Sequence, residues 1–239
     1  MQRVINFSGG KTSALMTILC YQPGDLVIFC DTGREHIETY NFIKNFENFE
    51  KIPIIKLSYY NSKQPFNLMY EKRKYKILPN RVKRICTVEL KIKTCRRYLK
   101  SIGINQYENL IGFRYDELLR IKNRKQQWKK VYDKFPLYEK KINKAMVNDY
   151  WSKKEYNLNI PSILGNCDLC FMKGKNAIIS ILTKYPELAE KWINDEKLSN
   201  RKYFPDITYE QLLYIAKNNL FKDYDLNEIK PSYNCACTN

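Results

Sequence analysis

The sequence predicts an α/β fold, in which a parallel sheet is flanked by helices and a mainly helical part follows toward the C-terminus. Three observations support this prediction. Short apolar runs alternate with helical segments over the first third of the chain, a glycine-rich turn follows the first apolar run, and three further helical segments come after residue 175. Strands that alternate with helices of about ten residues form βαβ units, whose strands pair in parallel.

The individual elements follow from these patterns in chain order. The predicted strands are residues 4–7, 26–30, 52–57 and 109–113. The predicted helices are residues 12–21, 37–49, 88–99, 175–185, 186–197 and 209–218. We therefore predict an α/β domain over residues 1–125 and a mainly helical region over residues 126–239.

The composition indicates a folded intracellular protein. The chain has 239 residues, of which 44% are hydrophobic, and this is enough for a sizeable core. It contains no run of about 18 apolar residues, so we expect no membrane span. The apolar stretch over residues 1–7 is too short for a secretory signal, so we expect a cytoplasmic protein.

The net charge of +17 favours a polyanionic partner, and nucleic acid is the partner that we expect. Lysine and arginine are dense over residues 70–100 and again over residues 122–144, where aromatic residues stand among the lysines. The alternative explanation is compositional, because the chain is rich in Lys, Asn, Ile and Tyr as a whole.

The turn after the first strand predicts a phosphate-binding loop. Its sequence is Ser8-Gly9-Gly10-Lys11-Thr12-Ser13, and a helix follows it directly. Glycine lets the backbone approach an anion closely, and the N–H groups at the start of a helix attract phosphate. Lys11 adds positive charge and the three hydroxyl residues add donors. The spacing differs from that of a Walker A loop.

Three segments, in family order, resemble the adenine nucleotide α-hydrolase (PP-loop) superfamily. This superfamily includes N-type ATP pyrophosphatases, tRNA thiolation enzymes and 3′-phosphoadenylylsulfate (PAPS) reductases. Residues 7–13 resemble its pyrophosphate loop, and residues 29–36 and 112–120 resemble the Asp-Thr-Gly and Gly-x-Arg-x-x-Glu segments of the PAPS reductase branch. The resemblance implies a Rossmann-like, HUP-type sheet that binds ATP or a PAPS-type adenine nucleotide. The implied nucleotide-binding residues are Ser8, Gly9, Gly10, Lys11, Thr12, Ser13, Asp31, Thr32, Gly33 and Arg114.

Four residues of these segments are the expected catalytic groups: Lys11, Asp31, Arg114 and Glu117. Asp31 follows an apolar strand, where open α/β sheets place their ligand groups. Arg114 is suited to bind a phosphate through two nitrogens, and Asp116 and Glu117 are suited to position Mg²⁺ or a substrate hydroxyl. The alternative is a surface ion-pair set of Arg114, Glu117 and Arg120 at helical spacing.

Residues 167–170, Cys-Asp-Leu-Cys, form a Cys-x-x-Cys pair, which can chelate a metal, bind an iron–sulfur cluster or act as a dithiol. With Cys86 upstream, the pair resembles the [4Fe–4S] ligand pattern of assimilatory adenylylsulfate reductases. Thr87 stands where that pattern has a second upstream cysteine. We expect Cys86, Cys167 and Cys170 to bind a [4Fe–4S] cluster. Structural zinc, or no metal, remains as an alternative, because thiolates suit both metals.

Two tail cysteines, Cys235 and Cys237, leave further roles open. We expect Cys235 as the fourth metal ligand, with Cys237, Cys95 or an open iron as the alternatives. We expect Cys237 as a catalytic nucleophile, although the tail does not match the Glu-Cys-Gly-Leu-His segment of PAPS reductases. An incidental tail is the remaining possibility.

Three function hypotheses follow. The first is an enzyme that splits ATP into AMP and pyrophosphate, and adenylates a nucleic acid, tRNA or DNA, for sulfur transfer or a similar modification. The second is a PAPS or adenylylsulfate reductase that releases sulfite. The third is a non-catalytic nucleotide- or nucleic-acid-binding module. A sulfur or electron donor protein and a second copy of the chain are the other partners that we expect.

Overall fold

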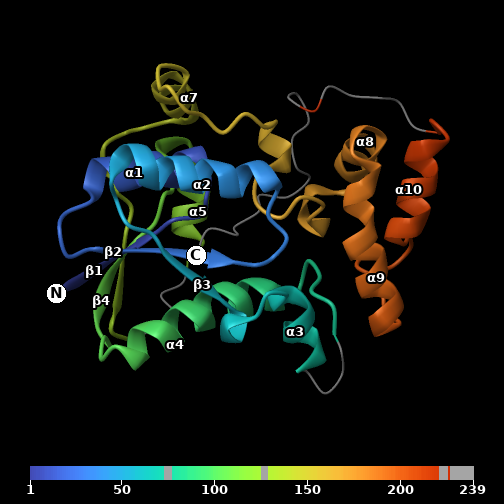
Figure 1. The fold of residues 1–239 in the computed structure, drawn as a ribbon, viewed down its shortest axis with the longest axis horizontal. Helices are drawn as coiled ribbons and strands as arrows, with labels where there is room; N and C mark the ends of the chain where they lie inside the picture. Colours follow the sequence, from blue (N-terminus) through green and yellow to red (C-terminus); the bar gives the residue numbers. More distant parts are fainter. Residues whose placement is uncertain (73–76, 125–128, 221–225, 227–239) are drawn as a thin grey trace.

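The structure is a computed structural model that describes residues 1–72, 77–124, 129–220 and 226. Its centre is a five-stranded sheet with the strand order β3-β2-β1-β4-β5, in which all neighbouring strands are parallel (Figure 1). The strands are β1 (Gln2–Asn6), β2 (Leu26–Asp31), β3 (Ile55–Ser58), β4 (Tyr107–Leu110) and β5 (Val131–Lys134). The predicted α/β class with a parallel sheet is confirmed.

Side chains alternate between the two faces of the sheet, as the pleat of a strand requires. Ile5 and Val27 pack beneath helices on one face, whereas Val4 and Ile28 lie in a separate core on the other face. The first face is covered by α1 (Lys11–Cys20), α2 (Ile37–Glu50) and α7 (Lys144–Ser152), and the second by α4 (Thr94–Ser101). The strands are therefore buried on both sides, which is typical of parallel sheets.

A third core belongs to the C-terminal helices. It contains Trp192 and Tyr209, both almost completely buried, and it extends to the segment around Cys167 and Cys170. Its helices are α3 (Pro65–Glu71), α8 (Lys175–Lys184), α9 (Ala189–Ser199) and α10 (Tyr209–Lys217), and Figure 1 shows the last three side by side at one end of the molecule. We call α8, α9 and α10 the helical lobe.

Several elements differ from the predictions. The third strand begins at Ile55 rather than at residue 52, and the basic helix expected over residues 88–99 is a π-helical segment, Thr87–Lys93, that continues into α4. Strand β5 was not predicted. It lies after residue 125, the predicted boundary between the α/β domain and the helical region, and that boundary stays a prediction. The short helices α5 (Leu118–Lys122) and α6 (Pro136–Glu139) complete the sheet domain. Among the described residues, no helix has the length and apolar character needed to cross a membrane.

Candidate active site

The loop between β1 and α1 closes on itself through one hydroxyl group. The backbone N–H of Ser8 donates to Ser13 Oγ at 3.0 Å, and the Ser13 hydroxyl donates to the carbonyl of Gly10, also at 3.0 Å. Helix α1 then begins at Lys11, and no described side chain caps it. The first N–H groups of a helix have no hydrogen-bond partner inside the helix. Those of α1 can therefore donate hydrogen bonds to an anion bound at the loop.

Close packing fixes the backbone of this loop. Gly9 has φ +78°, and a Cβ placed on it would come within 2.7 Å of Thr39 Cγ2 on α2. A Cβ placed on Gly112, after β4, would lie 3.4 Å from the Cα of Ser13. Glycine therefore meets two requirements here, a left-handed backbone at Gly9 and a close approach of two chain segments at Gly112.

Lys11 and Trp151 connect the loop to the helix that covers it. The indole nitrogen of Trp151, on α7, donates to the carbonyl oxygen of Lys11 at 2.8 Å. Partial burial lowers the pKa of the Lys11 ammonium from its usual value. Burial disfavours the charged form of the Lys11 side chain. An anion bound at the loop would stabilise that charged form.

Arg114 reaches the loop from the segment after β4. Its Nη1 lies 3.4 Å from Thr12 Oγ1, and its Nε lies 3.0 Å from Asp116 Oδ1. Glu117 accepts the backbone N–H of Arg114 through Oε2 and pairs with Arg120 through Oε1. The ion pairs of the alternative interpretation are therefore present, and they also hold the Arg114 guanidinium against the phosphate loop.

Asp31 ends β2 at the same edge of the sheet. Its Oδ1 accepts the backbone N–H of Gly33 at 2.7 Å and the hydroxyl of Tyr40 at 2.8 Å. Burial, together with the neighbouring Asp31 charge, raises the pKa of Tyr40, so this phenol remains a donor. The described residues provide no hydrogen bond to Oδ2, which leaves that oxygen for a ligand.

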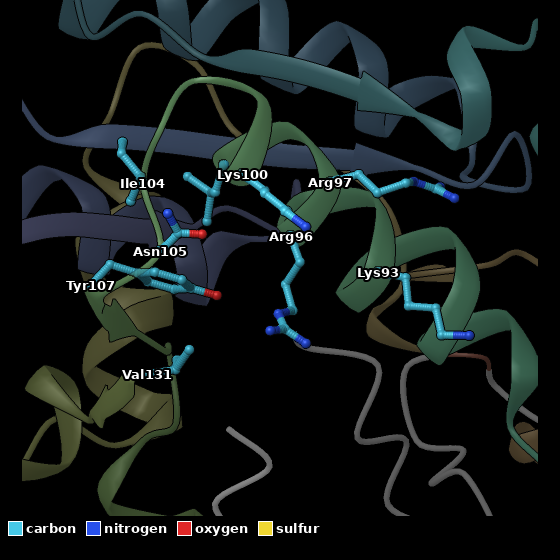
Figure 2. Close-up of a pocket in the computed structure, with 9 residues that line it drawn as sticks. Lys93, Arg96, Arg97, Lys100, Ile104, Asn105, Tyr107 and Val131 are labelled. Carbon is cyan, nitrogen blue, oxygen red and sulfur yellow. The ribbon is translucent and has the colours of Figure 1, made fainter. Parts of the chain in front are cut away.

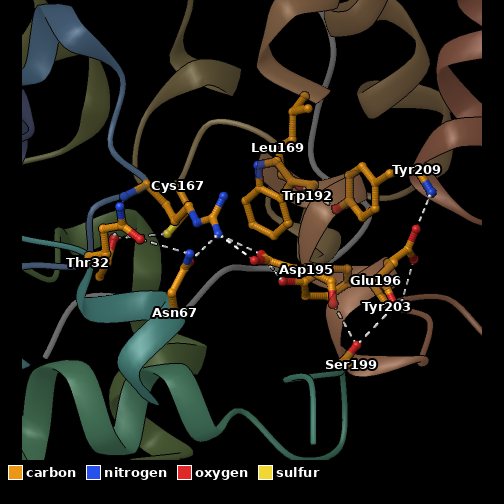
Figure 3. Close-up of polar contacts among 12 residues, drawn as sticks. Thr32, Asn67, Cys167, Leu169, Trp192, Asp195, Glu196, Ser199, Tyr203 and Tyr209 are labelled. Carbon is orange, nitrogen blue, oxygen red and sulfur yellow. Dashed lines mark hydrogen bonds and ion pairs between the residues drawn. The ribbon is translucent and has the colours of Figure 1, made fainter. Parts of the chain in front are cut away.

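Residues 167–170, which carry the Cys-x-x-Cys pair and which we call the cysteine loop, dock directly on this edge (Figure 3). Cys167 forms an isolated antiparallel bridge with Glu35, and the N–H of Asp168 donates to the carbonyl of Arg34 at 2.9 Å. Figure 3 shows Thr32 and Cys167 next to each other, with Thr32 Oγ1 3.6 Å from the Cys167 sulfur. The structure thus brings a predicted nucleotide-binding residue and a predicted metal ligand together.

Buried polar groups hold the cysteine loop in shape. The Lys173 ammonium, 5% exposed, donates to the carbonyl oxygens of Cys167 and Asp168 at 2.7 and 2.6 Å. Trp192, on α9, donates to the Asp168 carboxylate at 2.9 Å. The loop is therefore fixed by residues outside its own four positions, one of them in the helical lobe.

A buried ion pair joins the strand edge to the same lobe. Arg34 Nη2 lies 2.7 Å from Asp195 Oδ2, both side chains are at most 3% exposed, and the guanidinium carbon lies 4.8 Å and 5.4 Å from the ring centres of Phe66 and Trp192. Tyr203 also donates to Asp195, at 2.8 Å. Burial raises the pKa of Asp195, while Arg34 and this hydrogen bond act to lower it.

The predicted metal ligands are only partly brought together. Cys86, Cys167 and Cys170 all contact the core of the helical lobe, but no three His, Cys, Asp or Glu side chains within the described ranges gather closely enough for a metal ion. Cys95 lies elsewhere, beside Cys30 under the sheet. Cys235 and Cys237 lie outside the described residues. The described cysteines do not by themselves form a complete ligand set.

Sequence reasoning missed several residues that shape the site. They are Tyr40, which orients Asp31, and Trp151, Lys173, Trp192 and Asp195, which support the two loops. Arg34 and Glu35 directly follow the Asp-Thr-Gly segment, so their proximity to Asp31 could have been predicted from the sequence. The partners of Trp151, Trp192 and Asp195 are distant in the sequence, and no local pattern singles out Tyr40 or Lys173.

Comparison with known proteins gives one family match and several relatives. The family model of the phosphoadenosine phosphosulfate reductase domain matches residues 2–160. The uncharacterized nin region protein ORF290 of Escherichia phage lambda is 28% identical over 204 residues, which cover 74% of this chain and 68% of the phage protein. The uncharacterized protein MJ0066 of Methanocaldococcus jannaschii is 26% identical over 209 residues, 80% of this chain but only 40% of the archaeal protein.

A solved structure is also similar. It is the crystal structure of PAPS reductase from Candida auris in complex with phosphate, with a TM-score of 0.41 and 14% sequence identity. The match covers 64% of this chain and 71% of that chain.

Proposed function

This chain belongs to the phosphoadenosine phosphosulfate reductase domain family, whose members use adenine nucleotides, and on that premise we propose that it is an enzyme that adenylates a nucleic acid. ATP is split between its α and β phosphates. An oxygen of the acceptor attacks the α phosphorus, the bond to the bridging oxygen breaks, and pyrophosphate leaves. A sulfide or amine nucleophile then displaces AMP from the acceptor.

The uncapped start of α1 beside Lys11 is the observation that best supports this proposal. The N–H groups of the loop, with the Lys11 ammonium, can hold the β and γ phosphates as they become pyrophosphate. Arg114, held against Thr12, can neutralise charge that develops on the α phosphate. Glu117 positions Arg114 in this scheme, and Asp31, with Oδ2 available, binds the Mg²⁺ that accompanies ATP.

We also propose a [4Fe–4S] cluster on Cys86, Cys167, Cys170 and Cys235, with zinc as the alternative metal. The two cysteines of the pair lie in one loop beside the buried Lys173, whose charge favours thiolates. The full set includes Cys235, which the structure does not describe. Anaerobic purification followed by iron, sulfide and zinc analysis tests the metal; one equivalent of zinc without iron replaces the cluster by a zinc site.

A second candidate function is the reduction of PAPS or adenylylsulfate. The proximity of the Cys167 sulfur to Thr32 favours it, because a thiolate beside the Asp-Thr-Gly segment could attack the sulfur of a bound sulfonate, displace the nucleotide and carry the sulfonate until a dithiol releases it as sulfite. The catalytic role predicted for Cys237 belongs to the same chemistry. Sulfite release from PAPS or adenylylsulfate in the presence of a dithiol donor measures this activity directly.

The first test is incubation with α-labelled ATP and either bulk tRNA or DNA. We expect labelled AMP on the acceptor and stoichiometric pyrophosphate, and we expect the Lys11→Ala variant to lose both. Lys184→Ala, at the exposed end of α8, is the matched control and should retain activity. If neither acceptor yields AMP or pyrophosphate while sulfite forms from PAPS, adenylation is wrong and the reductase replaces it.

A further inference from the structure

Helix α4 presents a stripe of four cations on the face of the sheet opposite to α1 and α2 (Figure 2). The stripe comprises Lys93, Arg96, Arg97 and Lys100, and Lys93 immediately precedes the helix. Residues three and four positions apart share one side of a helix, so these side chains lie on one side of α4. Cys95 and Leu99, on the part of α4 that faces the sheet, are buried, and Leu99 also reaches the hollow described next.

A hollow of about 330 Å³ lies beside this stripe. Its floor is apolar, formed by Leu99, Ile104 and Val131, and its polar wall is formed by Asn105 and Tyr107, which Figure 2 shows at the side of the hollow away from Arg97. Among the described residues that line it, there is no carboxylate. An apolar hollow with one amide, one aromatic ring and a cationic rim is suited to an unstacked base and its phosphates.

Two acidic side chains near the stripe, Glu89 and Asp133, have partners of their own. Glu89 pairs with Lys93 at 2.8 Å, at one end of the stripe. Asp133 accepts from Asn109 at 2.7 Å and pairs with Arg124, on the same face of the sheet as Tyr107 and Val131.

Two contacts hold Arg97 in position before any ligand arrives. Its Nη2 donates to Thr94 Oγ1 at 3.0 Å, and its guanidinium carbon lies 4.1 Å from the centre of the Tyr60 ring. An ordered guanidinium loses less conformational entropy when it binds an anion than a free one does. This arrangement distinguishes the stripe from a set of freely moving surface lysines.

We propose that the α4 stripe and its hollow bind a single strand of nucleic acid, with the phosphates on the cations and one unstacked base in the hollow. The stripe spans about 10 Å, at 1.5 Å per residue of helix, which is long enough to contact more than one phosphate of a strand. A duplex offers no unstacked base for the hollow. The proposal deepens the proposed function and rests on it, since it assigns a surface to the nucleic-acid acceptor.

The test measures binding of a fluorescent 12-nucleotide single strand at several salt concentrations without ATP. We expect Arg96→Gln with Lys100→Gln to weaken binding roughly tenfold. The salt slope should become less negative by about 0.7 for each phosphate that the variant no longer neutralises. The matched control is Lys184→Gln with Lys217→Gln, which removes the same charge from exposed ends of α8 and α10 and should leave the slope nearly unchanged.

A second variant tests the hollow separately from the charge. Val131→Trp fills it, and we expect weaker binding of the single strand with an unchanged salt slope; a duplex of the same sequence should be insensitive. Circular dichroism and the unfolding midpoint verify that each variant is folded. Equal losses in the control pair, or wild-type binding by the stripe variant, overturn the proposal.

The two proposals fail in different ways. If the single strand of nucleic acid binds through the stripe but no AMP forms, adenylation is contradicted and the proposal for the stripe is supported. Formation of AMP on an acceptor that binds equally well to the stripe variant contradicts the stripe and keeps adenylation.

Discussion

The phosphate loop and the cysteine loop lie at one edge of the sheet, yet they are built in opposite ways. The phosphate loop closes through hydrogen bonds within residues 8–13 and then packs against α2 and α7, whereas the cysteine loop depends for its hydrogen bonds on Arg34, Lys173 and the helical lobe. The contact between Thr32 and Cys167 of the cysteine loop joins residues that are 135 positions apart. The hydrogen bonds that close the phosphate loop are therefore local in the sequence, whereas those that hold the cysteine loop include partners far away in the sequence.

The largest expected effect comes from breaking the ion pair beneath the cysteine loop. Asp195→Ala leaves the buried Arg34 guanidinium without its carboxylate, and such losses cost about 3–5 kcal/mol. Urea unfolding measures the free energy of unfolding. The control is Asp149→Ala, which breaks an exposed pair with Lys153 and should cost about 1 kcal/mol or less. Equal losses in the two variants would contradict a structural role for the buried pair.

The next effect tests the packing of the phosphate loop against α2. Gly9→Ala adds about 1–2 kcal/mol of left-handed backbone strain and, because its Cβ would meet Thr39, about 1–3 kcal/mol of overpacking. Gly24→Ala has the same kind of strain at φ +96° but meets nothing within 4 Å. We expect only Gly9→Ala to lose ATP affinity, measured by calorimetry; an equal loss in both variants contradicts the packing argument.

Two tryptophans allow the two loops to be separated. Trp192→Phe removes a hydrogen bond to the Asp168 carboxylate and should cost about 1.5–3 kcal/mol of stability without changing the Kd for ATP. Trp151→Phe removes a bond to the Lys11 carbonyl, should cost about 1 kcal/mol, and should weaken ATP binding. Thermal unfolding and ATP titration of both variants test this. A change in the Kd for ATP only in Trp192→Phe would contradict the assignment of Trp151, and not Trp192, to the phosphate loop.

The smallest effect is a pH dependence at the phosphate loop. Because burial lowers the pKa of Lys11 below 10.5, ATP affinity should begin to fall at a lower pH than for an ordinary lysine. Lys11→Arg keeps its charge throughout this range and should remove the fall. Titrations with ATP from neutral to alkaline pH make the comparison, and parallel curves for the two proteins would show that another group titrates.

The sequence indicated the phosphate loop well because its residues are consecutive and its backbone does the binding. It also indicated four of the five strands. Strand β5 was missed because Val131 is the only buried residue in it, and it stands in a basic stretch without alternating apolar side chains. Arg34 and Asp195 are 161 positions apart, so no pattern in the sequence could pair them.

The bridge between Glu35 and Cys167 also affects the order in which parts of the chain can fold during synthesis. A ribosome releases β2 and the phosphate loop early, but β1 lacks its second neighbour until β4 emerges. The cysteine loop and α9 follow much later. Domains fold as they emerge, and long-range contacts form last. A nascent chain that has emerged as far as residue 160 already contains all five strands, but its Asp31 edge still lacks the cysteine loop and α9.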